Sequence, residues 1–171
     1  MKYITNNRGD VDCFACAWLV TRFIDPAAEF RFVPSDRVIG VAEAEGAIPY
    51  NVRGVELSDN GSRCSFDVFL SKYGLKKPAL RRLARIVRGA DHKRLKLAPQ
   101  AAGLLAVTVG LSRMYPDDYD ERLEYVLIVY DALYAWCGGR RNPASQPAAR
   151  VRKLPIKRPA RASGPGRRAG R

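Results

Sequence analysis

Charge is divided very unevenly along the 171 residues of this chain. Residues 138–171 read GGRRNPASQPAARVRKLPIKRPARASGPGRRAGR and hold eleven of the 30 Lys and Arg residues, but none of the 17 Asp and Glu residues. Residues 1–137 therefore carry 19 basic and 17 acidic side chains, a net charge of +2. A segment so rich in Pro, Gly, Ala and Arg buries too little apolar surface to offset its ordering entropy. We expect one folded domain over residues 1–137 and a disordered basic tail over residues 138–171.

The pattern of residues 1–137 predicts an α/β fold that is predominantly helical, with a small sheet of about three short strands. Strands are expected at 2–5, 28–34 and 54–57. Helices are expected at about 12–24, 37–46, 65–73, 78–90, 99–114 and 118–137, the second closed by Gly46 and the fourth opened by Pro78. The order strand, helix, strand at the start indicates a βαβ unit.

Several classes of protein are disfavoured by what the sequence lacks. It has no run of about 18 apolar residues and no apolar signal-peptide core at its start, so we expect a cytosolic protein without a membrane span. Four cysteines are too few for a disulfide scaffold. There is no glycine-rich phosphate loop and no flavin or nicotinamide motif, and the only histidine is His92. We therefore expect no cofactor, no bound metal and no turnover.

Cys13 and Cys16 form a C-x-x-C at the predicted start of the first helix. This position is typical of a thioredoxin-like redox pair, because a helix N-terminus favours the thiolate. Phe14 and Ala15 between them are not the residues of a redox motif, and a zinc site would need Cys64 and His92 at a spacing that matches no zinc module. Cys16 also shares a helix face with apolar residues. The favoured interpretation is that Cys16 is a small buried core residue.

A longer set of segments resembles a known family. The segments RFIDPAAEF, VAEAEGAIP, GVEL, YGL, PALRRLARIVRGAD and YDALYAWC follow, in order, the pattern of the chromate-resistance protein family of ChrB type, over about residues 1–137. The resemblance implies a chromate-response protein that senses or handles the oxyanion, as a regulator of transcription or an accessory of chromate resistance.

The chain departs from the family pattern at three places. Cys13 stands where the family has an arginine, so the family chemistry cannot depend on the C-x-x-C. The turn after GVEL, SDNG at residues 58–61, lacks the usual histidine, and Arg88 replaces the histidine of an H-G-A-D motif. These losses weaken any metal or anion site that would use those side chains.

The candidate anion-binding residues are Arg8, Asp12 and Cys16. Chromate is a tetrahedral dianion, and Arg8 lies just before a helix start whose free N–H groups can bind such an anion. Alternatively, Arg8 pairs with Asp10 or Asp12, and Asp12 is simply a helix cap.

Other positions that match the family are Cys64, Glu56, Asp91 and Asp131. Cys64, with Cys16, is a candidate thiol for Cr(VI) chemistry. Glu56 can equally be a solvated strand residue, and Asp91 lies at a helix end where the dipole does not help a carboxylate. Asp131 falls among apolar residues of the last helix, so its carboxylate needs a partner.

Two other functions remain open. The basic tail can bind the phosphate backbone of DNA or RNA non-specifically, although it offers no element that reads bases. The cysteines can alternatively serve a thiol-dependent accessory role in sulfur transfer or Cr(VI) reduction.

Overall fold

The computed structural model describes residues 1–140. The predicted disordered tail, apart from residues 138–140, lies outside the described residues. The described part is predominantly helical with one small sheet, which confirms the predicted fold class. No helix within residues 1–140 is both long enough and apolar enough to cross a membrane.

The sheet contains three parallel strands in the order β2-β1-β3. The strands are β1 (Lys2–Asn6), β2 (Glu29–Val33) and β3 (Ile48–Pro49). Helix α1 (Val11–Phe23) connects β1 to β2, so the predicted βαβ unit is confirmed. Four of the five residues of β1 are buried, as expected for a central strand with both faces covered.

The prediction of a third strand at residues 54–57 is wrong. The third strand is β3, which pairs with β1 and ends eight residues before the end of the predicted strand. Of the predicted residues 54–57, only Leu57 pairs with another segment, through an isolated bridge to Tyr50. Residues 53–54 form a turn in which Gly54 has a φ of +93°, so the segment cannot run straight. Strand β3 instead follows Gly46, the left-handed C-cap of helix α2 (Val38–Glu45).

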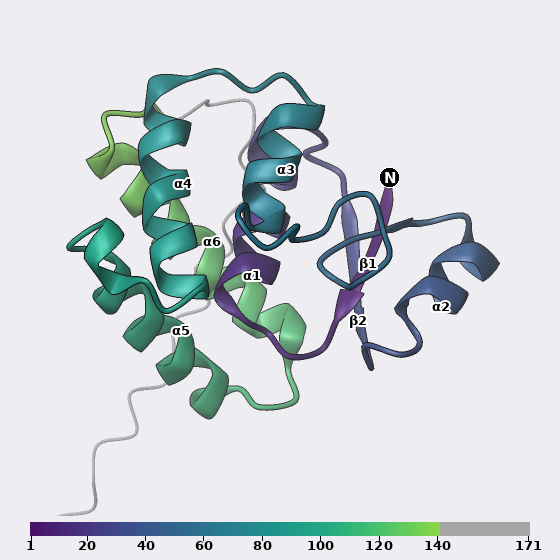
Figure 1. Cartoon of the computed structure of the whole chain (residues 1–171). Coiled ribbons are helices and arrows are strands. Elements are labelled where there is room, and N and C mark those ends of the chain that lie inside the picture. Colours follow the sequence, from purple (N-terminus) through teal and green to yellow (C-terminus); the bar gives the residue numbers. More distant parts are fainter. Residues whose placement is uncertain (141–171) are drawn as a thin grey trace, which may run out of the picture.

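The two faces of the sheet are covered by different helices (Figure 1). Side chains alternate along β1, so Ile4 packs with Val38 and Ala42 of α2, whereas Tyr3 belongs to the main core beside α1. The main core is built from α1 and the helices α3 (Ser65–Lys72), α4 (Pro78–Asp91), α5 (Ala101–Met114) and α6 (Tyr119–Trp136), with a short 3-10 helix η1 (Leu95–Leu97) before α5.

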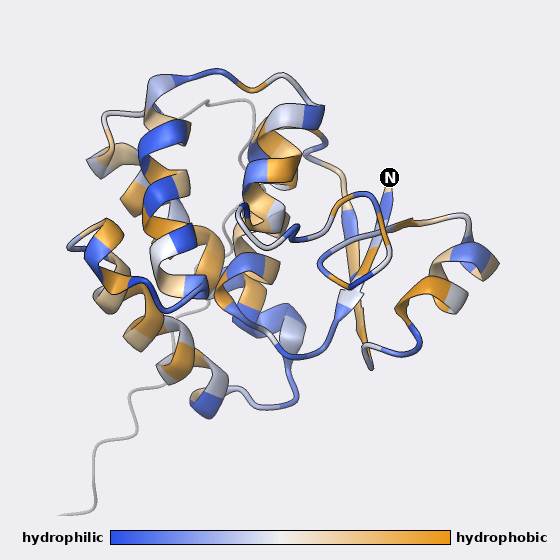
Figure 2. Cartoon of the chain, in the orientation of Figure 1, coloured by the Kyte–Doolittle hydropathy of each residue, from blue (hydrophilic) through white to orange (hydrophobic). Residues whose placement is uncertain are grey.

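Helix α1 lies at the centre of the helical layer. All of its residues from Val11 to Arg22 are buried, which a helix reaches only when neighbours enclose it on every side. Trp18 is fully buried among aromatic rings of α3 and α6, including Phe66 and Tyr130. By contrast α4 is amphipathic, with a hydrophilic outer side that Figure 2 shows in blue, as the sequence predicted.

Candidate functional site

A polar cluster surrounds the first turn of α1. Strand β1 ends at Asn6, and the chain then turns through Gly9, whose φ of +62° places it in the left-handed region that glycine adopts readily. Asp10 caps α1, because its Oδ1 accepts the backbone N–H of Cys13 at 2.8 Å and also the amide of Asn51 at 3.1 Å. The turn that was predicted as an anion cradle is therefore already an N-cap.

Asp12 is a helix cap, but the helix that it caps is α3 and not its own helix α1, whose N-cap is Asp10. Its buried carboxylate accepts the backbone N–H of Ser65 at 2.6 Å and of Phe66 at 2.9 Å, and so caps α3. The residue at the cap position of α3 itself is Cys64, whose side chain makes no capping bond. Burial raises the pKa of Asp12 to about 6, because the hydrogen bonds from Ser65 and Phe66 offset only part of the desolvation.

The thiols near this cluster are buried. Cys13, Cys16 and Cys64 are each fully buried, and the Cys16 Sγ lies 3.9 Å from Asp12 Oδ1. Burial, reinforced by the nearby carboxylates, raises the pKa of the three thiols above the ordinary value of a cysteine. The interpretation of Cys16 as a core residue is confirmed, and the redox interpretation of the C-x-x-C loses its basis because a raised pKa disfavours the reactive thiolate.

Asp91, the last residue of α4, reaches the same cluster. His92 Nε2 lies 3.5 Å from Asp91 Oδ2 and 2.6 Å from Asp59 Oδ2. One possible ligand atom from each of Asp59, Asp91 and His92 lies within 4.8 Å of the other two, so these residues could together bind one divalent cation. Within residues 1–140, no cysteine belongs to a cluster of possible metal ligands. Burial, reinforced by the charges of Asp12 and Asp10, raises the pKa of Asp91 to about 7.

The raised pKa of Asp91 predicts that its charge destabilises the fold above neutral pH. A carboxyl with a pKa of about 7 when folded, against about 4 when unfolded, holds its proton more tightly in the folded state, so its contribution to stability is full below about pH 4 and is lost as pH rises through 7. Asp91→Asn should therefore raise the free energy of unfolding by about 1–2 kcal/mol at pH 8 and change it little at pH 4.5.

Urea unfolding of both proteins at the two pH values, with a chelator present, measures this difference. Glu43→Gln is a matched control, because Glu43 is exposed on α2 and this substitution removes the same single negative charge. An equal effect of Asp91→Asn at both pH values contradicts the prediction.

Arg8 and Arg122 flank the turn before α1. Arg8 is exposed, and its backbone N–H donates to Asn6 Oδ1 at 3.0 Å. Arg122, only 2 % exposed, donates to the backbone carbonyls of Tyr115 at 3.1 Å and Pro116 at 2.8 Å, and lies over the Tyr119 ring. A Cβ at Gly9 would collide with Arg122 Nη1, so only glycine leaves room for this guanidinium.

The other predicted residues lie elsewhere. Glu56 is exposed in a turn, not in a strand, and pairs with Lys72. Asp131 does have the predicted partners, since its carboxylate accepts Trp18 Nε1 at 2.8 Å and Arg22 Nε at 2.9 Å, on the part of α1 that follows the cluster. The structure thus brings Asp12, Cys16, Cys64 and Asp91 together, places Arg8 beside them, and separates Glu56 and Asp131 from them.

Several residues of the cluster were missed from the sequence. Asp59 and His92 carried a weak signal, since His92 is the only histidine and follows Asp91 directly. Ser65 and Arg122 carried no signal in the sequence, because both are distant along the chain from the residues that they contact. Ser65 is 53 residues from Asp12, and Arg122 is 113 residues from Gly9. Arg88 makes two hydrogen bonds of 2.9 Å to Asp67, so the residue that replaces the family histidine is engaged in an ion pair.

Comparison with known proteins identifies the lineage. Residues 3–137 match the family described as ChrB, C-terminal domain. A curated relative, Protein ChrB of Cupriavidus metallidurans, is 35% identical over 125 residues, which make up 72% of this chain and 37% of the relative. The chain therefore spans little more than a third of that protein. No solved structure matches the chain.

Proposed function

This chain belongs to the ChrB C-terminal domain family, and on that premise we propose that it is a chromate-response protein that senses or handles the chromate oxyanion. The proposal concerns binding, and regulation or assistance of resistance that follows from binding, without turnover. The structural observation that supports it most is the pair of arginines on either side of the turn before α1.

Arg122 contributes a buried positive charge next to this turn. Its described hydrogen bonds go to backbone carbonyls, and no carboxylate of residues 1–140 forms an ion pair with it. A buried charge without a counter-ion acts strongly on its surroundings, because little water screens it. Together with the exposed guanidinium of Arg8, it supplies positive charge beside the turn at Gly9, which supports binding of a tetrahedral dianion there.

The two aspartates of the turn would repel a dianion, but the hydrogen bonds that their carboxylates accept offset part of their negative potential. Asp12 is buried and directed at the N–H groups of Ser65 and Phe66, and Asp10 is engaged with Cys13 and Asn51. Both carboxylates are thus occupied by donors of the protein. The N–H of Cys13 is also occupied, so the proposed cradle relies on the arginines more than on helix N–H groups.

Calorimetry with chromate, and separately with sulfate, tests the proposal. We expect Arg8→Ala to weaken chromate binding about tenfold, which corresponds to about 1.4 kcal/mol. Arg37→Ala is the matched control, because Arg37 is exposed at the start of α2, on the opposite side of the sheet from α1, and this variant should bind like the wild type. Equal binding by all three proteins would move the site away from Arg8. An absence of binding by the wild type would contradict the proposed function.

The alternative of a thiol-dependent accessory finds less support in the structure. Every cysteine of the chain is buried, and burial raises the pKa of each thiol. Reaction with Cr(VI) or a sulfur donor requires an accessible thiolate. The experiment that separates the two functions is chromate consumption in the presence of an added thiol, compared with the same thiol without protein. A protein that only binds chromate does not increase the rate of consumption.

A further inference from the structure

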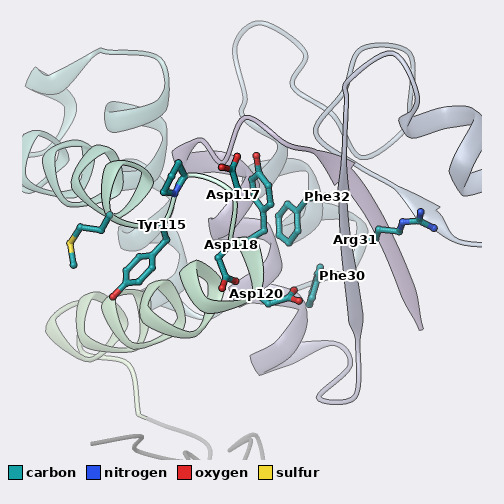
Figure 3. A pocket seen from close by; sticks show the side chains of 10 residues that line it. Phe30, Arg31, Phe32, Tyr115, Asp117, Asp118 and Asp120 are labelled. Carbon is teal, nitrogen blue, oxygen red and sulfur yellow. The ribbon is translucent and has the colours of Figure 1, made fainter. Parts of the chain in front are cut away.

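A groove of about 620 Å³ lies between the edge of the sheet and the start of α6 (Figure 3). It borders the turn before α1, because the Tyr119 hydroxyl donates to the carbonyl of Asn7 and Arg122 lies over the Tyr119 ring. One wall is formed by residues 30–32 of β2, and the other by residues 114–120, which join α5 to α6. Phe32 stacks on Tyr119 with ring centroids 5.1 Å apart, so the floor is aromatic. The groove thus combines apolar walls with the acidic residues of the α5–α6 connection.

The acidic side of the groove consists of Asp117, Asp118 and Asp120, all exposed. Asp118 caps α6, since its carboxylate accepts the N–H of Glu121 at 2.9 Å, so one of the three aspartates has a structural role. No Lys or Arg of residues 1–140 forms an ion pair with Asp117 or Asp120. Arg31 points away from them in Figure 3 and pairs with Glu45. At Asp117 and Asp120 the groove therefore presents negative charge that no ion pair within residues 1–140 neutralises.

The groove also reaches an open strand edge. Strand β2 is the outer strand of the order β2-β1-β3. Consecutive residues of a strand point to opposite faces, so a groove that touches Phe30, Arg31 and Phe32 extends across the outer edge of β2. Backbone groups at such an edge are available to an extended segment. An occupant should accordingly be extended and basic, with some large apolar side chains.

One segment of this chain has that character. Residues 150–158 read RVRKLPIKR, with five basic residues and no acidic one. They also contain Val151, Leu154 and Ile156, the only large apolar residues of the tail. We propose that the groove between β2 and the α5–α6 connection binds residues 150–158 of the same chain, with their basic side chains against Asp117 and Asp120 and their apolar side chains against the aromatic floor.

The length of the chain permits this contact. The groove lies at the N-terminal end of α6, and the tail begins beyond its C-terminal end. The 18 residues of α6 span about 27 Å, and ten extended residues from Arg140 to Arg150 cover about 33 Å. The basic segment can therefore return along α6 to the groove. Tethering raises its effective concentration to the millimolar range, so a weak intrinsic affinity is sufficient.

Zero-length cross-linking of the full chain with a carbodiimide, followed by mass spectrometry, tests the contact directly. We expect Lys153 or Lys157 to be joined to Asp117 or Asp120 within one molecule, and the products to disappear at about 0.5 M salt, where charge attraction is screened. Mixing isotope-labelled and unlabelled protein distinguishes links within a chain from links between chains. Links between chains only, or links spread evenly over all exposed carboxylates, would overturn the proposal.

Limited trypsin digestion gives a second readout. The double variant Asp117→Asn/Asp120→Asn should be cut after Arg150, Arg152 and Lys153 at least about threefold faster than the wild type, because the attraction that protects the segment is removed. Asp36→Asn/Glu43→Gln neutralises two exposed carboxylates elsewhere and should leave the rate unchanged. Equal rates in all three proteins would contradict the contact. Neither experiment uses chromate, so their outcome is separate from that of the proposed function.

Discussion

Replacing Asp12 by alanine should lower the free energy of unfolding by about 3–5 kcal/mol, a large fraction of the total for a domain of this size. The change removes the acceptor of two buried backbone N–H groups, those of Ser65 and Phe66, at the start of α3. A buried donor that loses a charged acceptor costs about 1–3 kcal/mol, because water cannot replace the bond. Urea unfolding measures the loss, and hydrogen exchange should show faster exchange at the start of α3 in particular.

Asp10→Ala is the matched control for this prediction. Asp10 is a carboxylate two residues away that caps α1 in the ordinary way, at a site that is only partly buried. Loss of an N-cap typically costs about 1 kcal/mol, so this variant should be clearly milder. If Asp12→Ala costs no more than Asp10→Ala, the carboxylate of Asp12 does not hold α3 to α1.

Replacing Asp131 by alanine should cost about 3–5 kcal/mol, because it breaks a largely buried ion pair from one side. The Asp131 carboxylate accepts Arg22 Nε at 2.9 Å, Arg22 Nη2 at 3.0 Å and Trp18 Nε1 at 2.8 Å, and it thereby ties α6 to α1. The Arg22 side chain is 8% exposed, so water can solvate the remaining guanidinium only poorly. Urea unfolding should show the loss, and the fluorescence of Trp18 should change in the folded state.

A double variant separates the ion pair from general packing. Arg22→Met/Asp131→Leu removes both charges and retains apolar volume, and such replacements of buried pairs are often close to neutral. We therefore expect the double variant to be more stable than Asp131→Ala. A double variant that is as unstable as the single one would show that the loss comes from packing and not from the charge left by Asp131.

The local signals of the sequence were sufficient for most elements of the fold. Gly46 closes α2 in the left-handed conformation, and Pro78 opens α4, as their chemistry requires. The apolar period of α4 placed Leu80, Leu83, Ile86 and Val87 in the core. Such signals act within a few residues, so they can be read without the rest of the chain. The third strand was misplaced because strand pairing is decided by residues far apart, and both GVEL and AIPY have short apolar patterns.

The candidate site shows the same division more sharply. From its own residues the sequence determined that Cys16 is a core residue and that Asp131 needs a partner, because an apolar helix face implies burial and a buried carboxylate demands donors. Only the tertiary structure decided that Asp12 caps α3 rather than α1, that His92 meets Asp59, and that Arg122 fills the space beside Gly9. These contacts join segments 33 to 113 residues apart, and no periodicity or capping rule extends over such distances. They arise because packing of α1 inside the helical layer leaves polar groups of several helices with no water to bind, so they must bind one another.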